Sequence, residues 1–219
     1  MNIKRRELCL GLAGAGVLPL LLPGLASAQD TPVEGSHFVR LSQPATTSSP
    51  GKVEVVEFFW YGCPHCNAFE PSLDAWSRKL PADVVFRRMP VALREEWAMH
   101  QRIFFALDAM GQVEAMHRKT FYAIHKDRMQ LEKPAEISAF MAKNGIDGAK
   151  FLENLNSFTV QTKARQANQL AAAYKIDGVP TLGVQGRFST APSLPAMAGS
   201  HERTLAVVDF LVERSRKTA

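Results

Sequence analysis

Cysteine is scarce in this sequence, with three residues in 219, at positions 9, 63 and 66. Secreted proteins that depend on disulfides for stability are dense in cysteine, and their bridges close long loops. A bridge between Cys63 and Cys66 would close almost no loop, and a chain of this length buries a core without one. We therefore expect the role of this pair to be chemical.

Ligand sets for metals are missing as well. A zinc site normally takes four ligands, usually in two spaced pairs, and the sequence has no second cysteine pair. Five histidines outside the cysteine motif form no H-x-x-x-H or similar set, and we expect them at the surface or partly packed: His37, His100, His117, His125 and His201. The sequence predicts no metal site and no other cofactor.

Strong charge of either sign is also absent, since the formal net charge is +5. No cluster of lysine and arginine alternates with aromatic residues, as it would on a nucleic-acid surface. The hydrophobic and charged fractions, 46% and 21%, are ordinary for a globular protein. A nucleic-acid partner is therefore not expected.

The longest apolar run lies at the N-terminus. Three basic residues at 4–6 precede an apolar stretch at 8–25, and Ala26-Ser27-Ala28 follows with the small residues of a cleavage site. This order is typical of a secretory signal peptide cleaved after Ala28, which predicts export to the periplasm. A membrane anchor is the competing interpretation, because the run reaches about 18 residues, but glycines and prolines interrupt it. The arginine pair leaves the export route, general secretory or twin-arginine, open.

The cysteine motif joins a predicted strand to a predicted helix. The β-branched and aromatic run at 53–60 is typical of a buried strand. Apolar residues at helical spacing follow from 64 to 80, where Pro64 suits the first helical turn and Pro71 predicts a kink. A second apolar run at 84–89 completes a β-α-β unit, with the cysteines at the strand-to-helix turn.

Strand patterns are absent between about 95 and 167, where apolar residues repeat with helical spacing. Pro134 opens one of these helices, Asn144-Gly145 closes it, and Asp147 is placed to cap the next. A strand at 181–184 and an amphipathic helix at 201–216 then resume the α/β pattern. The sequence predicts one α/β domain over 29–219, with an α-helical subdomain inserted at about 95–167.

The segment Cys63-Pro64-His65-Cys66 has three interpretations: half of a zinc site, a structural staple or a redox pair. The redox interpretation gives a chemical reason for the residues around the two cysteines. Cys63 would lie at a helix N-terminus, where free N–H groups and the helix dipole stabilise a thiolate, and His65 could add charge or an N–H donor to the same sulfur. Such stabilisation makes the disulfide more oxidising, by roughly 30 mV for each ~1.4 kcal/mol. Cys66 is expected to be buried and to resolve the mixed disulfide.

Glu57 and the pair Val179-Pro180 are further candidates. Strand alternation points Glu57 towards the space beneath the cysteines, where a buried carboxyl could move protons for Cys66. The alternative is a structural carboxylate satisfied by a salt bridge. Pro180 begins a strand after a glycine-bearing turn, where a cis peptide can form and would present the Val179 backbone to an incoming chain.

These residues resemble the thioredoxin superfamily and, within it, the DsbA family of periplasmic dithiol oxidases. The resemblance covers nearly all of 29–219, and C-P-H-C is more specific than C-x-x-C, because thioredoxin-like reductases usually carry Gly-Pro between the cysteines. It implies a thioredoxin-like fold, with Cys63 as the attacking cysteine, Cys66 as the resolving one and His65 tuning the thiolate. It also implies that Glu57 is the buried acid and Pro180 a cis-proline beside the disulfide.

The resemblance implies that the protein donates its Cys63–Cys66 disulfide to reduced, newly exported proteins. The implied partner is a quinone-linked membrane reoxidase of the DsbB type. Two alternatives stay open: a periplasmic disulfide reductase or isomerase, and a chaperone-like binding protein in which the redox pair is incidental. Periplasmic isomerases carry an N-terminal dimerisation domain, for which residues 29–52 are too few, and we expect a monomer.

Overall fold

Five strands form one sheet in residues 31–217, the part of the protein that the computed structural model describes. The predicted signal peptide and its cleavage site after Ala28 lie outside these residues. In spatial order the strands are β1 (Val39–Arg40), β5 (Phe188–Thr190), β4 (Thr181–Val184), β2 (Val53–Phe59) and β3 (Val84–Pro90). Strand β2 pairs in parallel with β3 and antiparallel with β4, which makes the sheet mixed.

Strand β2 is buried at every residue, as its β-branched and aromatic side chains predict. Its register with β3 places Glu57 opposite Arg88. Its register with β4 places Phe58 opposite Thr181, the first residue of β4. The carboxyl end of β2 therefore lies beside the start of β4, and the cysteine motif follows directly from it.

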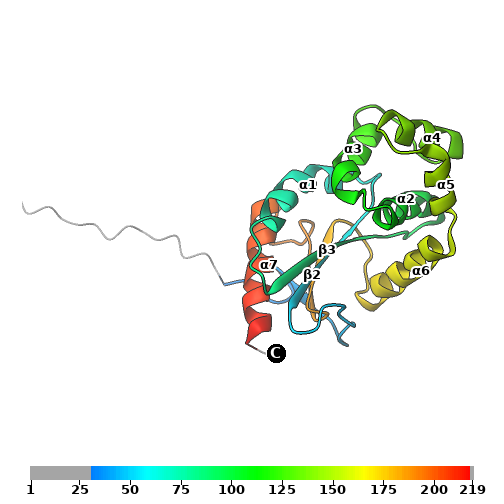
Figure 1. The fold of residues 1–219 in the computed structure, drawn as a ribbon. Coiled ribbons are helices and arrows are strands. Elements are labelled where there is room, and N and C mark those ends of the chain that lie inside the picture. Colours follow the sequence, from blue (N-terminus) through cyan, green and yellow to red (C-terminus); the bar gives the residue numbers. More distant parts are fainter. Residues whose placement is uncertain (1–30, 218–219) are drawn as a thin grey trace, which may run out of the picture. The chain divides into compact units, whose positions relative to one another are not determined.

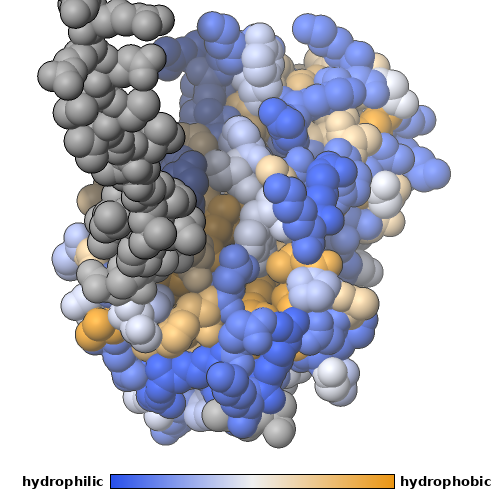
Figure 2. Space-filling view, turned by 90° about the vertical axis from the view of Figure 1, so that its left-hand side faces the viewer, coloured by the Kyte–Doolittle hydropathy of each residue, from blue (hydrophilic) through white to orange (hydrophobic). Residues whose placement is uncertain are grey.

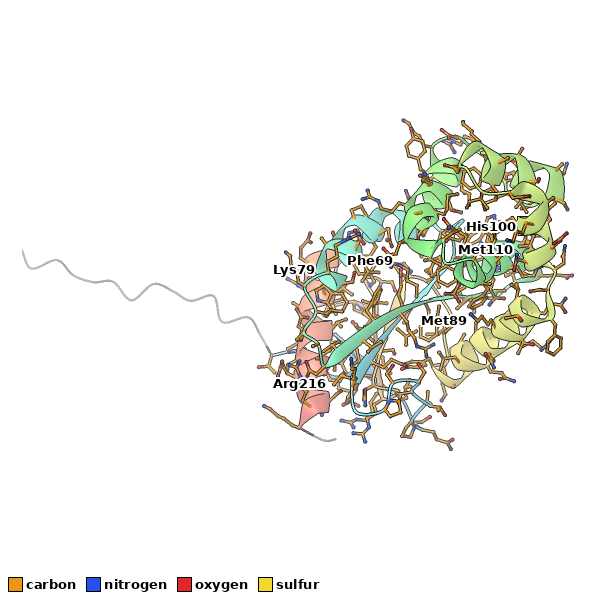
Figure 3. The ribbon with its side chains drawn as sticks, viewed as in Figure 1. Phe69, Lys79, Met89, His100, Met110 and Arg216 are labelled. Carbon is orange, nitrogen blue, oxygen red and sulfur yellow. The ribbon has the colours of Figure 1, made fainter. Side chains whose placement is uncertain are left out.

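Helix α1 (Pro64–Ser77) connects β2 to β3 and packs against the C-terminal helix α7 (His201–Arg216), as Figure 1 shows. Phe69 of α1 is fully buried, with its ring centre 4.9 Å from that of His201, and it is labelled where the two helices meet in Figure 3. The β-α-β unit is confirmed. Helix α1 tolerates Pro71 but ends at Ser77, three residues before the predicted end at 80.

The inserted helices follow β3 and precede β4 (Figure 1). They are η1 (Glu95–Trp97), α2 (Ala98–Ala109), α3 (Val113–His125), α4 (Pro134–Lys143), α5 (Gly148–Leu155) and α6 (Phe158–Ala173). Asp147 caps α5 as predicted, because its carboxylate accepts the backbone N–H of Lys150 at 3.0 Å. The sheet with its helical insertion confirms the predicted fold class.

After β4 the sequence indicates only a loose strand or a loop through Gly199, and the structure shows one more strand there, β5, which pairs with β4 and β1. The turn between β4 and β5 requires glycine at position 186, where φ is +62° and a Cβ would lie 2.1 Å from the carbonyl oxygen of Ala45. A strand of three residues carries too little periodicity to be recognised in the sequence. Pairing with its neighbours defines it instead.

None of the helices in residues 31–217 is long and apolar enough to cross a bilayer. Figure 2 shows one side of the molecule, where apolar residues are visible in a central hollow and hydrophilic residues lie above it, below it and to its right.

Candidate active site

Cys63 is the N-cap residue of α1, and Cys66 lies within the first turn of the same helix. The backbone N–H of Cys66 donates to Sγ of Cys63 at 3.4 Å. Both cysteines are free thiols in this structure. Cys63 keeps 6% of its surface exposed and Cys66 none, so an incoming sulfur can reach only Cys63. Pro64 and His65, between them, are exposed.

The two thiols differ strongly in proton affinity. A hydrogen bond from the Cys66 side chain is the largest influence on Cys63, and it outweighs burial. With the backbone N–H groups of Cys66 and His65 and the charge of His65, it lowers the pKa of Cys63 to about 6. Burial, followed by the hydrogen bond to Cys63 and the charge of that sulfur, raises the pKa of Cys66. At neutral pH Cys63 is therefore a thiolate and Cys66 a thiol.

The peptide bond between Val179 and Pro180 is cis. The carbonyl oxygen of Val179 lies 3.4 Å from Sγ of Cys63. Val179 is half-buried and Pro180 is buried, and β4 begins at the next residue. The structure therefore brings the predicted substrate-binding pair next to the reactive sulfur.

Glu57 is completely buried on β2. Burial, the charge of Glu70 and, more weakly, the charge of Cys63 raise the pKa of Glu57 to about 8, against the opposing effect of Arg88. The charge of Glu57 in turn contributes to the raised pKa of Cys66. Its Oε2 lies 3.5 Å from Nε of Arg88. The sequence offered two interpretations of Glu57, a carboxyl beneath the cysteines and a structural carboxylate in a salt bridge. The structure contains both features, because Glu57 interacts electrostatically with the cysteines and also pairs with Arg88.

Four further residues near the site were not identified from the sequence. Arg88 donates through Nη2 to Oε1 of Glu70 at 2.7 Å, and Oε2 of Glu70 lies 3.4 Å from Nε2 of His117. Nδ1 of His117 is 2.9 Å from the hydroxyl of Tyr61. The sequence feature that could have pointed to Arg88 is the arginine pair in the middle of the apolar run at 84–89. No sequence feature points to His117 as part of the site, because only tertiary contact brings α3 to α1.

His117 and His100 correct the prediction that the histidines outside the motif lie at the surface or partly packed. Their exposed fractions are 3% and 5%. Tyr61 and Glu70 face His117, whereas His100 of α2, labelled in Figure 3, contacts the carbonyl oxygen of Gln130 through Nε2 at 2.7 Å. Each buried imidazole therefore has a polar partner, which makes burial acceptable.

Aromatic rings form the rim beside the motif. Trp60 stacks on Trp97 with ring centres 4.2 Å apart and planes at 5°. A Cβ on Gly62 would lie 2.3 Å from the Trp60 ring, so any larger residue at this position would have to displace the indole from its stack on Trp97. Among residues 31–217, no group of three or more His, Cys, Asp or Glu side chains could hold a metal ion.

Comparison with known proteins agrees with this geometry. The model of a family described as DSBA-like thioredoxin domain matches residues 82–201. The thiol:disulfide interchange protein DsbA of Pseudomonas aeruginosa is 43% identical over 196 residues, which cover 90% of this chain and 92% of that protein. The protein of the same name from Azotobacter vinelandii is 42% identical over 216 residues, covering 96% and 98%.

The crystal structure of Pseudomonas aeruginosa DsbA matches with a TM-score of 0.79 at 44% identity, covering 84% of this chain and 94% of that one. Identity at this level over nearly the full length of both proteins extends well beyond a shared fold. The chain therefore belongs to the DsbA family of thioredoxin-like thiol:disulfide interchange proteins.

Proposed function

We propose that this protein oxidises reduced, newly exported proteins by donating a disulfide between Cys63 and Cys66. The observation that carries the proposal is the asymmetry of the two thiols, with the pKa of Cys63 lowered to about 6 and that of Cys66 raised. A stabilised Cys63 thiolate favours the reduced form of the protein. The disulfide form is then a strong oxidant of other dithiols.

The reaction consists of two exchanges. A substrate thiolate attacks Sγ of Cys63, the Cys63–Cys66 bond breaks, and the sulfur of Cys66 takes up a proton. A second substrate thiol loses its proton and attacks the substrate sulfur of the mixed disulfide, which releases Cys63 as a thiolate. Two substrate thiols become one disulfide, and the protein gains the two electrons. In this scheme Cys63 is the attacked and released sulfur, and Cys66 is the leaving sulfur that takes up the proton. Cys66 resolves the mixed disulfide when the same exchange runs in reverse.

Glu57 serves as the proton donor to Cys66 in this scheme, and as the acceptor when the pair is reoxidised. Its support is the interaction with both sulfurs and a pKa raised to about 8, which keeps a proton available at neutral pH. His65 stabilises the Cys63 thiolate from the exposed side of the motif. Pro64 holds the first turn of α1, where a missing N–H costs no helical hydrogen bond.

Val179 and Pro180 form the proposed substrate-binding edge. The support is the 3.4 Å separation between the Val179 carbonyl oxygen and Sγ of Cys63. A substrate chain bonded to that sulfur must pass this backbone, whose polar groups can pair with any extended peptide regardless of its side chains. Such backbone pairing suits an enzyme that acts on many unfolded proteins.

The proposed setting is the periplasm. Residues 1–28 would be a signal peptide removed after Ala28, and residues 29–219 the thioredoxin-like domain with its helical insertion at about 95–167. Turnover as an oxidase requires an acceptor for two electrons, and we propose a quinone-linked DsbB-type membrane protein as that partner. The protein would act as a monomer.

The reduction potential of residues 29–219, equilibrated against glutathione buffers, tests the function. An oxidase should be far more oxidising than thioredoxin, whose potential is about −270 mV. A reduction potential near that of thioredoxin would instead indicate a disulfide reductase. Rearrangement of mispaired disulfides in a substrate protein would indicate a disulfide isomerase. A Cys63→Ser variant that keeps full biological activity would favour a chaperone-like binding protein.

A further inference from the structure

Two buried carboxylates share one arginine beneath the cysteines. Arg88 is 2.7 Å from Glu70 through Nη2 and 3.5 Å from Glu57 through Nε. The exposed fractions of the side chains are 11% for Arg88, 4% for Glu70 and 0% for Glu57. The three residues come from β3, α1 and β2, so the cluster exists only in the folded protein.

The charges of this cluster balance only if it also holds a proton. With both carboxylates ionised, one guanidinium would leave a net negative charge among buried side chains, which is unfavourable. Burial and the charge of Glu70 act in this direction on Glu57, raising its pKa to about 8. One proton and one negative charge are therefore divided between Glu57 and Glu70.

His117 and Tyr61 favour Glu70 over Glu57 as the position of the negative charge. Burial lowers the pKa of His117 and raises that of Tyr61, so at neutral pH the imidazole is uncharged and the phenol keeps its proton. When the hydroxyl of Tyr61 donates to Nδ1 of His117 across 2.9 Å, the ring N–H is on Nε2, 3.4 Å from Oε2 of Glu70. At 3.4 Å this contact is electrostatic, since among the described residues neither Oε2 of Glu70 nor Nε2 of His117 has a hydrogen-bond partner. Glu70 does accept a hydrogen bond from Arg88 through Oε1, whereas neither oxygen of Glu57 has a hydrogen-bond partner among these residues.

We propose that Glu57 and Glu70 act as a pair with one shared proton, and that Tyr61 and His117 keep the negative charge on Glu70 so that the proton stays on Glu57, beside the cysteines. The inference rests on the proposed function, for which Glu57 must hold that proton. Glu70, His117 and Tyr61 are positioning residues in this arrangement, because they act on the sulfurs only through Glu57.

Several charged or titratable groups lie around Glu57 and Glu70, and each of them can influence a titration of Cys63. Glu57 faces Arg88 of β3, Glu70 of α1 and the two cysteines, and Tyr61 interacts with its charge. His117 faces Glu70 and Tyr61 and is influenced by Arg88 and by Glu114 of its own helix. Glu114 is the one acidic group of α3 that acts on His117, and it stays unchanged in every variant below.

The test is the thiolate titration of Cys63 in the reduced full-length mature protein, followed by its ultraviolet absorbance. In Glu70→Gln the cluster keeps its net charge, but the negative charge must move to Glu57, next to the sulfur. The midpoint for Cys63 should therefore rise, by about one unit. If both carboxylates were ionised from the start, the substitution would only remove negative charge, and the midpoint would fall.

The same Glu70→Gln substitution should shift the Cys63 midpoint in the opposite direction when Glu57 has already been replaced. In a Glu57→Gln protein the charge has nowhere else to move, so adding Glu70→Gln should lower the Cys63 midpoint instead of raising it. The same sign in both backgrounds would overturn the proposal. Because each result compares variants with one another, it stands apart from the absolute reduction potential that tests the oxidase function.

Variants of the positioning residues complete the test. His117→Phe and the nearly isosteric Tyr61→Phe should each raise the Cys63 midpoint by less than Glu70→Gln, and neither should do so in the Glu57→Gln background. His100→Phe is the matched control, since His100 is a buried histidine of the same subdomain outside this cluster. Unchanged midpoints in both His117→Phe and Tyr61→Phe, or an equal rise in His100→Phe, would reject the role of these residues.

Discussion

The Sγ atom of Cys63 lies 3.4 Å from the carbonyl oxygen of Val179, 116 residues further along the chain. The contact follows from the sheet, because β4 pairs antiparallel with β2 and begins opposite Phe58. The motif that leaves β2 and the residues that enter β4 must therefore meet at the same edge. A reactive sulfur and a strip of accessible backbone are thus placed together by strand pairing.

His65→Ala should make the protein less oxidising. The exposed imidazole contributes only its charge to the lowered pKa of Cys63, since the backbone N–H at position 65 remains in the variant. We expect the Cys63 pKa to rise by about half a unit, which corresponds to a potential about 15 mV more reducing. Thiolate titration and equilibration with glutathione measure the two changes. His37→Ala is the control, and equal effects of both substitutions would remove His65 from the mechanism.

Cys66→Ala and Cys66→Ser should differ in their effect on Cys63. The hydrogen bond from the Cys66 side chain is the largest influence that lowers the pKa of Cys63. Alanine removes this donor and should raise the Cys63 pKa by about one unit or more, whereas the serine hydroxyl still donates and should retain most of the effect. Mixed with a substrate that already carries a disulfide, both variants should accumulate mixed disulfides, because the Cys63 thiolate attacks that disulfide and no Cys66 sulfur is present to resolve the product. Non-reducing electrophoresis makes these species visible. Identical titrations would show that the backbone N–H groups suffice.

Glu57→Gln should change how stability depends on pH. In the folded protein the pKa of Glu57 is raised from 4.5 to about 8, so between these values the folded state holds a proton that the unfolded state has released. The contribution of Glu57 to stability is therefore complete below about pH 4.5 and is lost as the pH rises towards 8.

Reduced wild-type protein should lose about 3 kcal/mol relative to reduced Glu57→Gln between about pH 5 and pH 8. Denaturant unfolding of both proteins across this range measures the difference. Comparing the two cancels the opposite contribution of Cys63, whose lowered pKa stabilises the reduced protein as the pH rises. Parallel pH profiles would mean that Glu57 is ionised throughout.

Gly183→Ala should destabilise the fold without changing the redox chemistry. A Cβ at this position in β4 would lie 2.3 Å from Cε1 of Tyr174, whose hydroxyl accepts the backbone N–H of Gly186 at 2.9 Å. Overpacking of this kind costs about 1–3 kcal/mol. At Gly178 a Cβ would meet no atom within 4 Å, and Gly178→Ala serves as the control in denaturant unfolding. Equal stabilities would show that the Tyr174 ring moves aside freely.

The sequence by itself determined the parts of this protein that depend on local periodicity and on a short motif. Hydrophobic runs identified β2 and β3, helical spacing identified α1 and the inserted helices, and the cap of α5 was recognised at Asp147. The motif at 63–66 identified the redox pair and, through the resemblance to the DsbA family, its direction of use. These features lie within a few residues of one another, so local preferences suffice to specify them.

Only the tertiary structure decided what lies around the sulfurs. Strand register set Glu57 opposite Arg88, and the packing of α3 against α1 brought His117 to Glu70. Such contacts join residues far apart in sequence, and no periodicity in either segment encodes them. Burial then changes their chemistry, because a carboxyl or an imidazole without water has a different proton affinity from the same group at the surface.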